Sequence, residues 1–340
     1  MVTGTSKIFK ILDLSGYMFS GKAALHDFIS EINGFWTPGN RHEFDLLRVK
    51  DGIADLENAV TSWSPIRSDA ATRRFLKVVK KMGASNSGIG RLKNAGFDYS
   101  SRYPQLITLS EKLIEDSTLA KWKMYWPYHL LDMSPLEVFI FKIKRKFFQI
   151  HDNLTYRLIS GVRFQDCLKD YLNELLSTGV DESLYHTILT NNAFEPFDPE
   201  RFVKYFHDAK CIVVNRDPRD IFATANQYSK GFNDQLSVYR NIAGAFDVHL
   251  FINRIKLYRE QVISSASPRV LRINFEDMVL RYEETAAKIY SFLCIDPKDH
   301  VNRFKYFNPE KSSENVGIWR RFSDKKSIRL IESELCEEEV

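Results

Sequence analysis

The segment 211–228 carries the residues best suited to chemistry on an anion. Its first four residues, 211–214, form a short apolar run with the length and β-branched content of a buried strand. The next signal, at 217–220, is typical of a helix start, with an aspartate at the N-cap and proline at the first helical position. Arg216 therefore lies where a strand meets a helix N-terminus, where backbone N–H groups and the helix dipole favour an anion, and Thr224 adds a hydroxyl further along the helix. The alternative is that Arg216 only closes the strand and pairs with a neighbouring aspartate.

A second candidate site follows the first apolar run of the chain. The stretch 16–23 has the spacing of a phosphate-binding loop, which is glycine, four residues, then glycine and lysine. Glycines allow a tight turn whose N–H groups converge on phosphate oxygens, and Lys22 adds a point charge. Nucleotide hydrolases need Ser or Thr after this lysine to hold magnesium, whereas here Ala23 and Ala24 follow. The pattern predicts a cradle for a phosphorylated ligand whose transferred group does not require magnesium; the alternative is a glycine-rich turn without a ligand.

A third candidate lies near the C-terminus, within 307–320. It contains several groups able to contact a phosphate, namely Lys311, Ser312, Ser313, the flexible backbone at Gly317, and Arg320. Such a segment could fold over a phosphate as a loop. The alternative is an ordinary polar loop that Trp319 anchors.

The elements that must position these residues alternate along the chain. Strands are expected at 8–14, 211–214 and 269–275, and helices at 22–32, 65–82, 246–262 and 282–293. Strands separated by helices predict an α/β fold, with a parallel sheet between two layers of helices. Residues 85–190 are mainly helical in pattern, with amphipathic segments at 109–120 and 164–176, and are interpreted as a helical insertion within one domain of residues 1–340.

Taken in order, the three candidates resemble the sulfotransferases that depend on 3′-phosphoadenosine 5′-phosphosulfate (PAPS). The resemblance rests on the Ser-Gly loop after the first strand, Arg216 with a hydroxyl eight residues later, and the C-terminal Lys/Ser…Gly-x-Trp-Arg loop. It extends to Val-Leu-Arg-Ile-Asn-Phe-Glu-Asp-Met-Val-Leu at 270–280 and to the following helix, and covers roughly residues 8–35 and 190–322. It implies the three-layer, P-loop-like fold. The wider layout looks most like bacterial sulfotransferases associated with cell-surface polysaccharides, which implies a role in polysaccharide or capsule biosynthesis.

The resemblance also implies roles for single residues. The loop would bind the 5′-phosphosulfate of PAPS, Arg216 and Thr224 would bind the 3′-phosphate, and the 311–317 loop with Arg320 would close over it. The residues assigned to the donor in this way are Phe19, Ser20, Gly21, Lys22, Ala23, Ala24, Arg216, Thr224, Lys311, Ser312, Gly317, Trp319 and Arg320. Many sulfotransferases carry a basic residue before the Ser-Gly pair, where this chain has Phe19, and the positive charge comes instead at Lys22.

Sulfuryl transfer further needs a general base for the acceptor hydroxyl. The segment 41–45 follows the first helix, where strand ends would converge on the loop. Glu43 resembles the carboxylate that polysaccharide sulfotransferases use, and His42 is the chemical alternative. Lys22 would stabilise the charge that builds on the leaving phosphate. Both Glu43 and His42 could instead belong to a solvated strand end.

Composition narrows the function class. The chain has 340 residues, 44% of them hydrophobic and 27% charged, with a formal net charge of +4, too small to argue for nucleic-acid binding. Four widely spaced cysteines fit a reducing compartment, and no apolar stretch approaches a membrane span, so we expect a cytoplasmic protein. The segment 138–148 interleaves aromatic and basic residues and could be a core helix rimmed by lysine stems or a helix on an anionic membrane surface.

These inferences favour a PAPS-dependent sulfotransferase without a metal, acting by in-line transfer on a hydroxyl of a glycan or glycan precursor. Two alternatives stay open. One is a P-loop kinase, against which Ala23 argues because magnesium lacks its usual loop hydroxyl. The other is a catalytically inactive module that binds PAPS, its product 3′-phosphoadenosine 5′-phosphate (PAP) or another nucleotide. The sequence does not indicate an oligomeric state.

Overall fold

The structure is a computed structural model that describes residues 7–37, 43–85, 97, 99–148, 154–228, 240–262 and 267–336. The chain forms two compact units. The helical unit consists of Asp45–Gly179 with Met1–Ile8 and Tyr205–His207, and the sheet unit of Phe9–Phe44, Val180–Lys204 and Asp208–Val340. All three candidate segments of the sequence analysis belong to the sheet unit.

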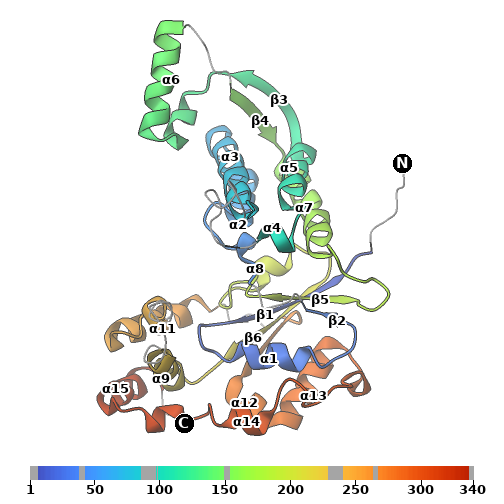
Figure 1. Cartoon of the computed structure of the whole chain (residues 1–340), viewed down its shortest axis with the longest axis vertical. Coiled ribbons are helices and arrows are strands. Elements are labelled where there is room, and N and C mark those ends of the chain that lie inside the picture. The colour runs from blue at the N-terminus through green and yellow to red at the C-terminus, as the bar shows by residue number, and fades with distance from the viewer. Residues whose placement is uncertain are drawn as a thin grey trace. The chain divides into compact units, whose positions relative to one another are not determined.

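The sheet unit is built on a five-stranded parallel sheet flanked by helices (Figure 1). The strand order is β2-β5-β1-β6-β7, with bounds β1 Lys10–Gly16, β2 Phe35–Trp36, β5 Thr187–Asn191, β6 Ala209–Asn215 and β7 Val270–Asn274. Its helices are α1 Lys22–Ile29, α8 Glu200–Val203, α9 Pro218–Tyr228, α11 Val248–Gln261, α12 Phe275–Leu280, α13 Tyr282–Leu293, α14 Pro309–Ser313 and α15 Lys325–Leu335. The predicted α/β class with a central parallel sheet is confirmed.

Successive side chains of the central strand β1 point to opposite faces of the sheet. Leu12 and Leu14 of β1 point to one face of the sheet, where they join a buried cluster with Phe28 of α1 and Ile289 of α13. On the opposite face, β1 carries Asp13 and Ser15, which are also fully buried. Parallel strands covered on both faces read as nearly continuous apolar runs, which is why β1, β6 and β7 were predicted from the sequence. The mainly helical prediction for 85–190 is wrong at its end, where β5 Thr187–Asn191 forms.

A second cluster lies among α9, α11, α15 and the 3₁₀ helix η6 Ile318–Arg321. Phe222 of α9 contacts Phe251 of α11 and Phe322, with ring centroids 5.2 and 5.9 Å apart. This cluster fixes the helix that follows Arg216 against the C-terminal part of the chain.

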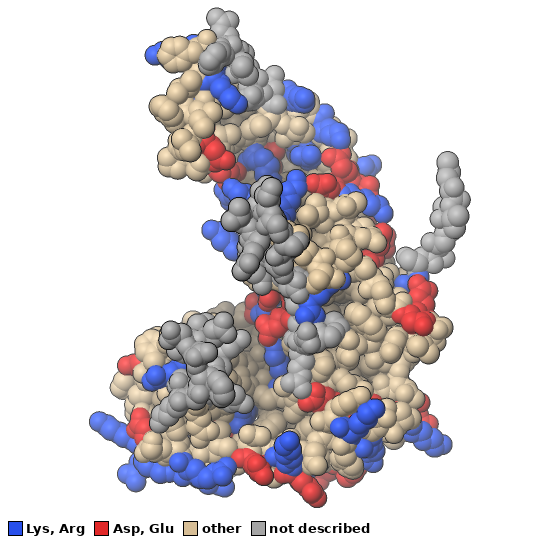
Figure 2. Space-filling model, viewed as in Figure 1, with Lys and Arg blue, Asp and Glu red and all other residues tan. Residues whose placement is uncertain are grey.

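The helical unit contains most of the predicted insertion. Its helices are α2 Ile53–Thr61, α3 Pro65–Met82, α4 Tyr99–Arg102, α5 Leu106–Ser117, α6 Pro135–Phe148 and α7 Gly161–Leu176, with the short 3₁₀ helices η2 Asp45–Leu47 and η4 Pro127–Asp132. On the visible surface of this unit, basic and acidic side chains are interspersed (Figure 2).

The helical prediction for 109–120 is wrong at its end. Helix α5 stops at Ser117, and the chain continues as β3 Thr118–Met124, which pairs antiparallel with β4 Leu154–Ile159. The paired residues of the two strands lie thirty or more positions apart, so the local pattern alone could not reveal the hairpin. Most side chains of β3 are exposed, so the strand lies at the surface of its unit.

Candidate donor site

The loop between β1 and α1 has the backbone form that its glycines predict. Phe19 and Gly21 adopt left-handed conformations, with φ of 60° and 88°. A Cβ at Gly21 would lie 2.3 Å from the ring of Phe275, and one at Gly16 would lie 2.2 Å from the hydroxyl of Ser20. Neither position therefore accepts a side chain, and the loop turns directly into the N-terminus of α1. This geometry offers backbone N–H groups and a helix dipole to an anion.

Ser20 supplies the clearest sign that this loop receives a ligand. Its side chain is 1% exposed, and its hydroxyl has no hydrogen-bond partner among the described residues. Buried hydroxyls in native structures are nearly always hydrogen-bonded. Ser20 lines a cavity of about 570 Å³, so a phosphate oxygen there would satisfy it. The residues present thus fit a phosphate group.

This cavity, which we call the donor cavity, gathers ten of the residues predicted to hold the donor. They are Phe19, Ser20, Gly21, Lys22, Ala23, Ala24, Arg216, Thr224, Lys311 and Ser312. Three segments that are far apart in the sequence therefore line the same cavity. Gly317, Trp319 and Arg320 are not among its lining residues.

Arg216 connects the two sides of the donor cavity. Its Nη1 donates to the carbonyl of Phe19 at 2.9 Å, and its Nη2 donates to the carbonyl of Asn315 at 2.6 Å. The guanidinium lies 5.0 Å from the ring centroid of Phe275. Its aspartate neighbours have other partners, since Asp217 pairs with Arg219 at 2.7 Å. A cation held between two loops in this way is suited to a phosphate that both loops enclose.

Thr224 lines the donor cavity, but its hydroxyl proton already takes part in a hydrogen bond. The side chain is mostly buried, and its hydroxyl donates to the carbonyl of Asp220, one helical turn earlier, at 2.7 Å. Serine and threonine in helices commonly form this bond. To donate to a phosphate, as predicted, the Thr224 hydroxyl would therefore have to rotate away from that carbonyl.

Asp220 is a site residue that the sequence analysis did not single out for this role. Its carboxylate accepts from the N–H of Gly317 at 2.7 Å and from the N–H of Trp319 at 3.0 Å, and burial raises its pKa. These bonds hold the left-handed turn at Gly317, while the exposed Arg320 lies over the Trp319 ring at 5.3 Å. Gly317, Trp319 and Arg320 thus form an anchor behind the segment that lines the donor cavity.

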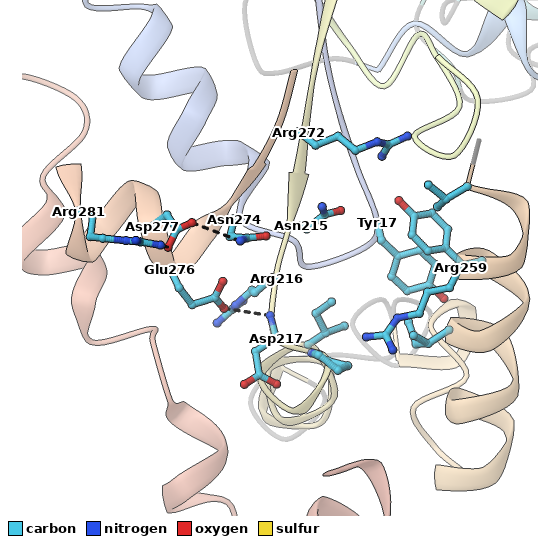
Figure 3. Close-up of a pocket in the computed structure, with 15 residues that line it drawn as sticks. Tyr17, Asn215, Arg216, Asp217, Arg259, Arg272, Asn274, Glu276, Asp277 and Arg281 are labelled. Atoms are coloured by element: carbon cyan, nitrogen blue, oxygen red, sulfur yellow. Dashed lines mark hydrogen bonds and ion pairs between the residues drawn. The ribbon is translucent and has the colours of Figure 1, made fainter. Parts of the chain in front are cut away.

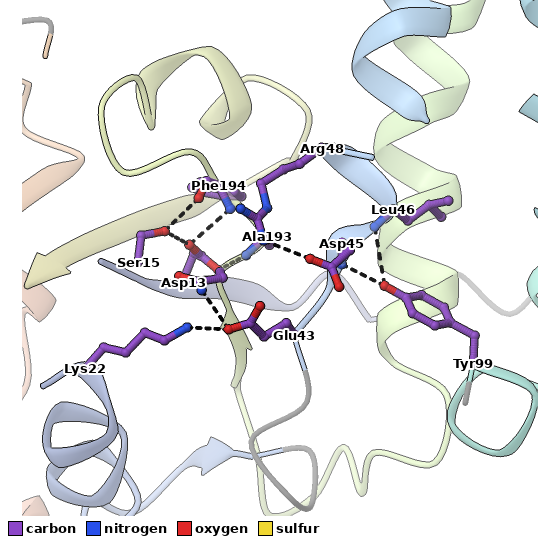
Figure 4. Close-up of polar contacts among 11 residues, drawn as sticks. Asp13, Ser15, Lys22, Glu43, Asp45, Leu46, Arg48, Tyr99, Ala193 and Phe194 are labelled. Atoms are coloured by element: carbon purple, nitrogen blue, oxygen red, sulfur yellow. Dashed lines mark hydrogen bonds and ion pairs between the residues drawn. The ribbon is translucent and has the colours of Figure 1, made fainter. Parts of the chain in front are cut away.

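The predicted base contacts the predicted lysine. Glu43 Oε1 accepts from Lys22 Nζ at 2.7 Å (Figure 4). The same oxygen accepts from Asn192 Nδ2 at 2.7 Å. The loop charge and the carboxylate therefore form an ion pair beside the donor cavity. His42 lies outside the described residues. Asn192 was missed, although its left-handed backbone, with φ of 48°, marks it as a specialised turn residue.

A buried aspartate fixes the turn that carries Asn192. Asp13 accepts from the N–H of Ala193 at 2.8 Å and from the N–H of Phe194 at 3.2 Å (Figure 4). It also accepts from the hydroxyl of Thr190 at 2.8 Å. Burial raises the pKa of Asp13, and these hydrogen bonds oppose the rise. The bonds run from the central strand through this turn to Glu43, so the sheet itself sets the position of the carboxylate.

A second cavity, of about 740 Å³, opens at the carboxyl ends of β6 and β7. Asn215 and Asn274 extend from these neighbouring strands, and Tyr17 and Arg216 also line the donor cavity (Figure 3). Glu276 accepts from the N–H of Asp217 at 2.9 Å, and burial raises the pKa of Glu276. Ligands of parallel α/β sheets bind outside the carboxyl ends of the strands, and both cavities lie at those ends.

Residues 144–299 match the model of the Sulfotransferase family. The match covers somewhat less than half of the chain. It includes β5, β6, β7 and Arg216, and it leaves out the loop of Ser20 and the segment of Lys311. No curated protein matches the chain.

Several solved structures of sulfotransferases are similar to the chain at low identity. The sulfotransferase domain from the curacin biosynthetic pathway is 13% identical, with a TM-score of 0.43 over 98% of this chain and 99% of that one. Retinol dehydratase, crystallised with androsterone and inactive cofactor PAP, is 13% identical, with a TM-score of 0.37 over 96% and 79%. Sulfotransferase STF9 from Mycobacterium avium is 11% identical, with a TM-score of 0.37 over 96% and 77%.

In the described ranges, no group of three or more His, Cys, Asp and Glu side chains is arranged to hold a metal ion. Of the helices within those ranges, none has the length and apolar content needed to span a bilayer.

Proposed function

We propose that the protein is a PAPS-dependent sulfotransferase acting on a hydroxyl group. The observation that carries the proposal is the convergence on one cavity of the glycine loop with its buried Ser20, of Arg216, and of the Lys22–Glu43 pair beside them. The family match to residues 144–299 supports the same activity.

In this proposal the two ends of the donor have different partners. The N–H groups at the start of α1, the Ser20 hydroxyl and Lys22 bind the phosphosulfate, and Arg216 with Thr224 binds the 3′-phosphate. Phe275 offers a flat apolar surface beside Arg216, and Lys311 closes the cavity from the C-terminal side. PAPS supplies the activated sulfuryl group when bound.

The reaction we propose is an in-line displacement. The acceptor oxygen forms a bond to sulfur as the bond between sulfur and the phosphate oxygen of PAPS breaks, and Glu43 takes the acceptor proton. Lys22 stabilises the charge that develops on the leaving phosphate. Asn192 holds the carboxylate of Glu43 in place throughout.

We further propose that the acceptor is a carbohydrate, either a glycan or a glycan precursor. Carbohydrates offer the hydroxyls that this chemistry needs. A role in polysaccharide or capsule biosynthesis would follow. Widely spaced cysteines suit a reducing compartment, so we place this activity in the cytoplasm.

The activity is tested by incubating the protein with PAPS and a panel of saccharides. Mass spectrometry should find a product heavier than its acceptor by one sulfuryl group, with PAP formed in equal amount. PAP binding without turnover on any acceptor would favour the inactive binding module. Phosphorylated products formed from ATP and magnesium would favour a kinase.

A further inference from the structure

Helix α6 of the helical unit carries an apolar stripe that the unit leaves uncovered. Leu136, Phe139, Ile140 and Phe147 are 66%, 60%, 44% and 69% exposed. With the half-buried Ile143 they are spaced at i, i+3, i+4, i+7 and i+11, which places them on one side of the helix. Among the described side chains 135–147, only Phe141 is buried. The interpretation of this segment as a core helix is therefore wrong.

The opposite side of α6 attaches it to the unit. The ring of Phe141 stacks on that of Tyr125 at 6.0 Å, and the guanidinium of Arg145 lies 4.7 Å from the same ring centroid. Phe141 and Arg145 are one turn apart and lie away from the stripe on the helix. The stripe consequently points outward from a helix that lies beside the β3–β4 hairpin at one end of its unit (Figure 1).

Cations border the stripe on both sides. Lys142 and Lys146 follow one edge in the helical periodicity, and Lys144 lies along the other. Glu137 is the one carboxylate in the α6 sequence, against four Lys and Arg residues. Leu131, which is 77% exposed in the preceding 3₁₀ helix η4, adds further apolar surface.

We propose that α6 binds the surface of an anionic lipid bilayer, lying in the plane of the interface. The apolar stripe would enter the boundary between headgroups and acyl chains, while the lysines extend to the lipid phosphates. Anionic lipid attracts such a basic segment with a strength that adds up over its lysines. A second copy of the chain fits less well, because pairing two α6 helices would bring their lysines together. The inference does not depend on the sulfotransferase activity.

The test is flotation of the full-length protein with vesicles. One set contains phosphatidylcholine alone, and the other an equal mixture of phosphatidylcholine and phosphatidylserine. The protein should float with the mixed vesicles, and added salt should weaken this binding. The variant Phe139→Ser/Phe147→Ser and the variant Lys142→Glu/Lys146→Glu should each lower the partition coefficient at least about tenfold.

The matched control is Leu184→Ser/Leu257→Ser, which removes two apolar side chains that are 64% and 57% exposed outside α6. It should float like the wild type, and circular dichroism should show all variants folded. The proposal is overturned if the wild type does not bind the mixed vesicles, or if both α6 variants bind as well as the control. It is also overturned if light scattering shows a dimer that Phe139→Ser/Phe147→Ser converts to a monomer, since the stripe would then be a contact between copies.

Discussion

Two hydrogen bonds hold Arg216 between the carbonyl of Phe19 and the carbonyl of Asn315. Both carbonyls belong to segments that line the donor cavity, so the position of this one cation depends on both. A phosphate entering between these segments would meet a guanidinium that is already placed. Pre-placement reduces the entropy cost of binding, which makes Arg216 the residue with the largest expected effect on donor affinity.

Arg216→Ala should weaken PAP binding by about 2 kcal/mol or more, as expected for the loss of a charge-assisted contact. Calorimetric titration measures the change directly. Arg303→Ala is the matched control, because it removes the same charge from an exposed arginine that pairs with Glu283 and lines neither cavity. Equal PAP affinity in wild type and Arg216→Ala would show that the 3′-phosphate does not bind at this residue.

Glu43→Gln should lower turnover by roughly a hundredfold or more, because a general base contributes on that scale. The glutamine keeps an oxygen that can accept from Lys22 and Asn192, so PAP affinity should stay within about twofold of the wild type. Steady-state kinetics and PAP titration together separate the two effects. Unchanged turnover would remove Glu43 as the base and turn attention to His42.

At the scale of elements, Asp220 joins α9 to the C-terminal turn. Its two carboxylate oxygens each accept one backbone N–H, from Gly317 and from Trp319. Asp220→Asn would direct an NH₂ group at one of these donors, which should lower the free energy of unfolding by about 1–3 kcal/mol. It should also weaken PAP binding, because the anchored segment lines the donor cavity. Asp170→Asn, at an exposed carboxylate, is the control in urea unfolding and titration; equal losses in both variants would contradict the anchoring role.

Asp13 should make the free energy of unfolding depend on pH. Burial raises its pKa above the ordinary value of 3.8, so the folded state binds this proton more tightly than the unfolded chain. The contribution to stability is then largest at low pH and falls as the pH rises from about 4 through the raised pKa. Urea unfolding of wild type and Asp13→Asn across this range measures the effect as a difference in free energy. A wild-type advantage that grows with pH would mean that the hydrogen bonds outweigh burial.

The predictability of each element depended on how local its sequence signals are. Strands and helices with strong apolar periodicity were predictable, and α3 and α13 lie within a residue of their predicted bounds. Ser20, Arg216 and Lys311 were predicted as ligand-binding residues from local sequence patterns, and all three line one cavity. Asn192 and Asp220 were not, since their partners lie 149 and 97 residues away along the chain. The β3–β4 hairpin was missed for the same reason.

At the scale of the whole molecule, every residue of the donor cavity lies in the sheet unit. PAP should therefore protect only this unit from hydrogen exchange, with the strongest slowing at 16–24 and 308–317, where bound ligand would stabilise backbone N–H groups. Exchange in α5 and α7 of the helical unit should not change directly. Protection confined to the helical unit would place the nucleotide elsewhere.

The most direct test of the account is a calorimetric titration of the purified protein with PAP in the absence of magnesium, beside ATP in its presence. The account predicts PAP binding at about micromolar dissociation constants, near −8 kcal/mol, with little response to ATP. No binding of PAP, or a clear preference for ATP with magnesium, would contradict the donor site built on Ser20 and Arg216.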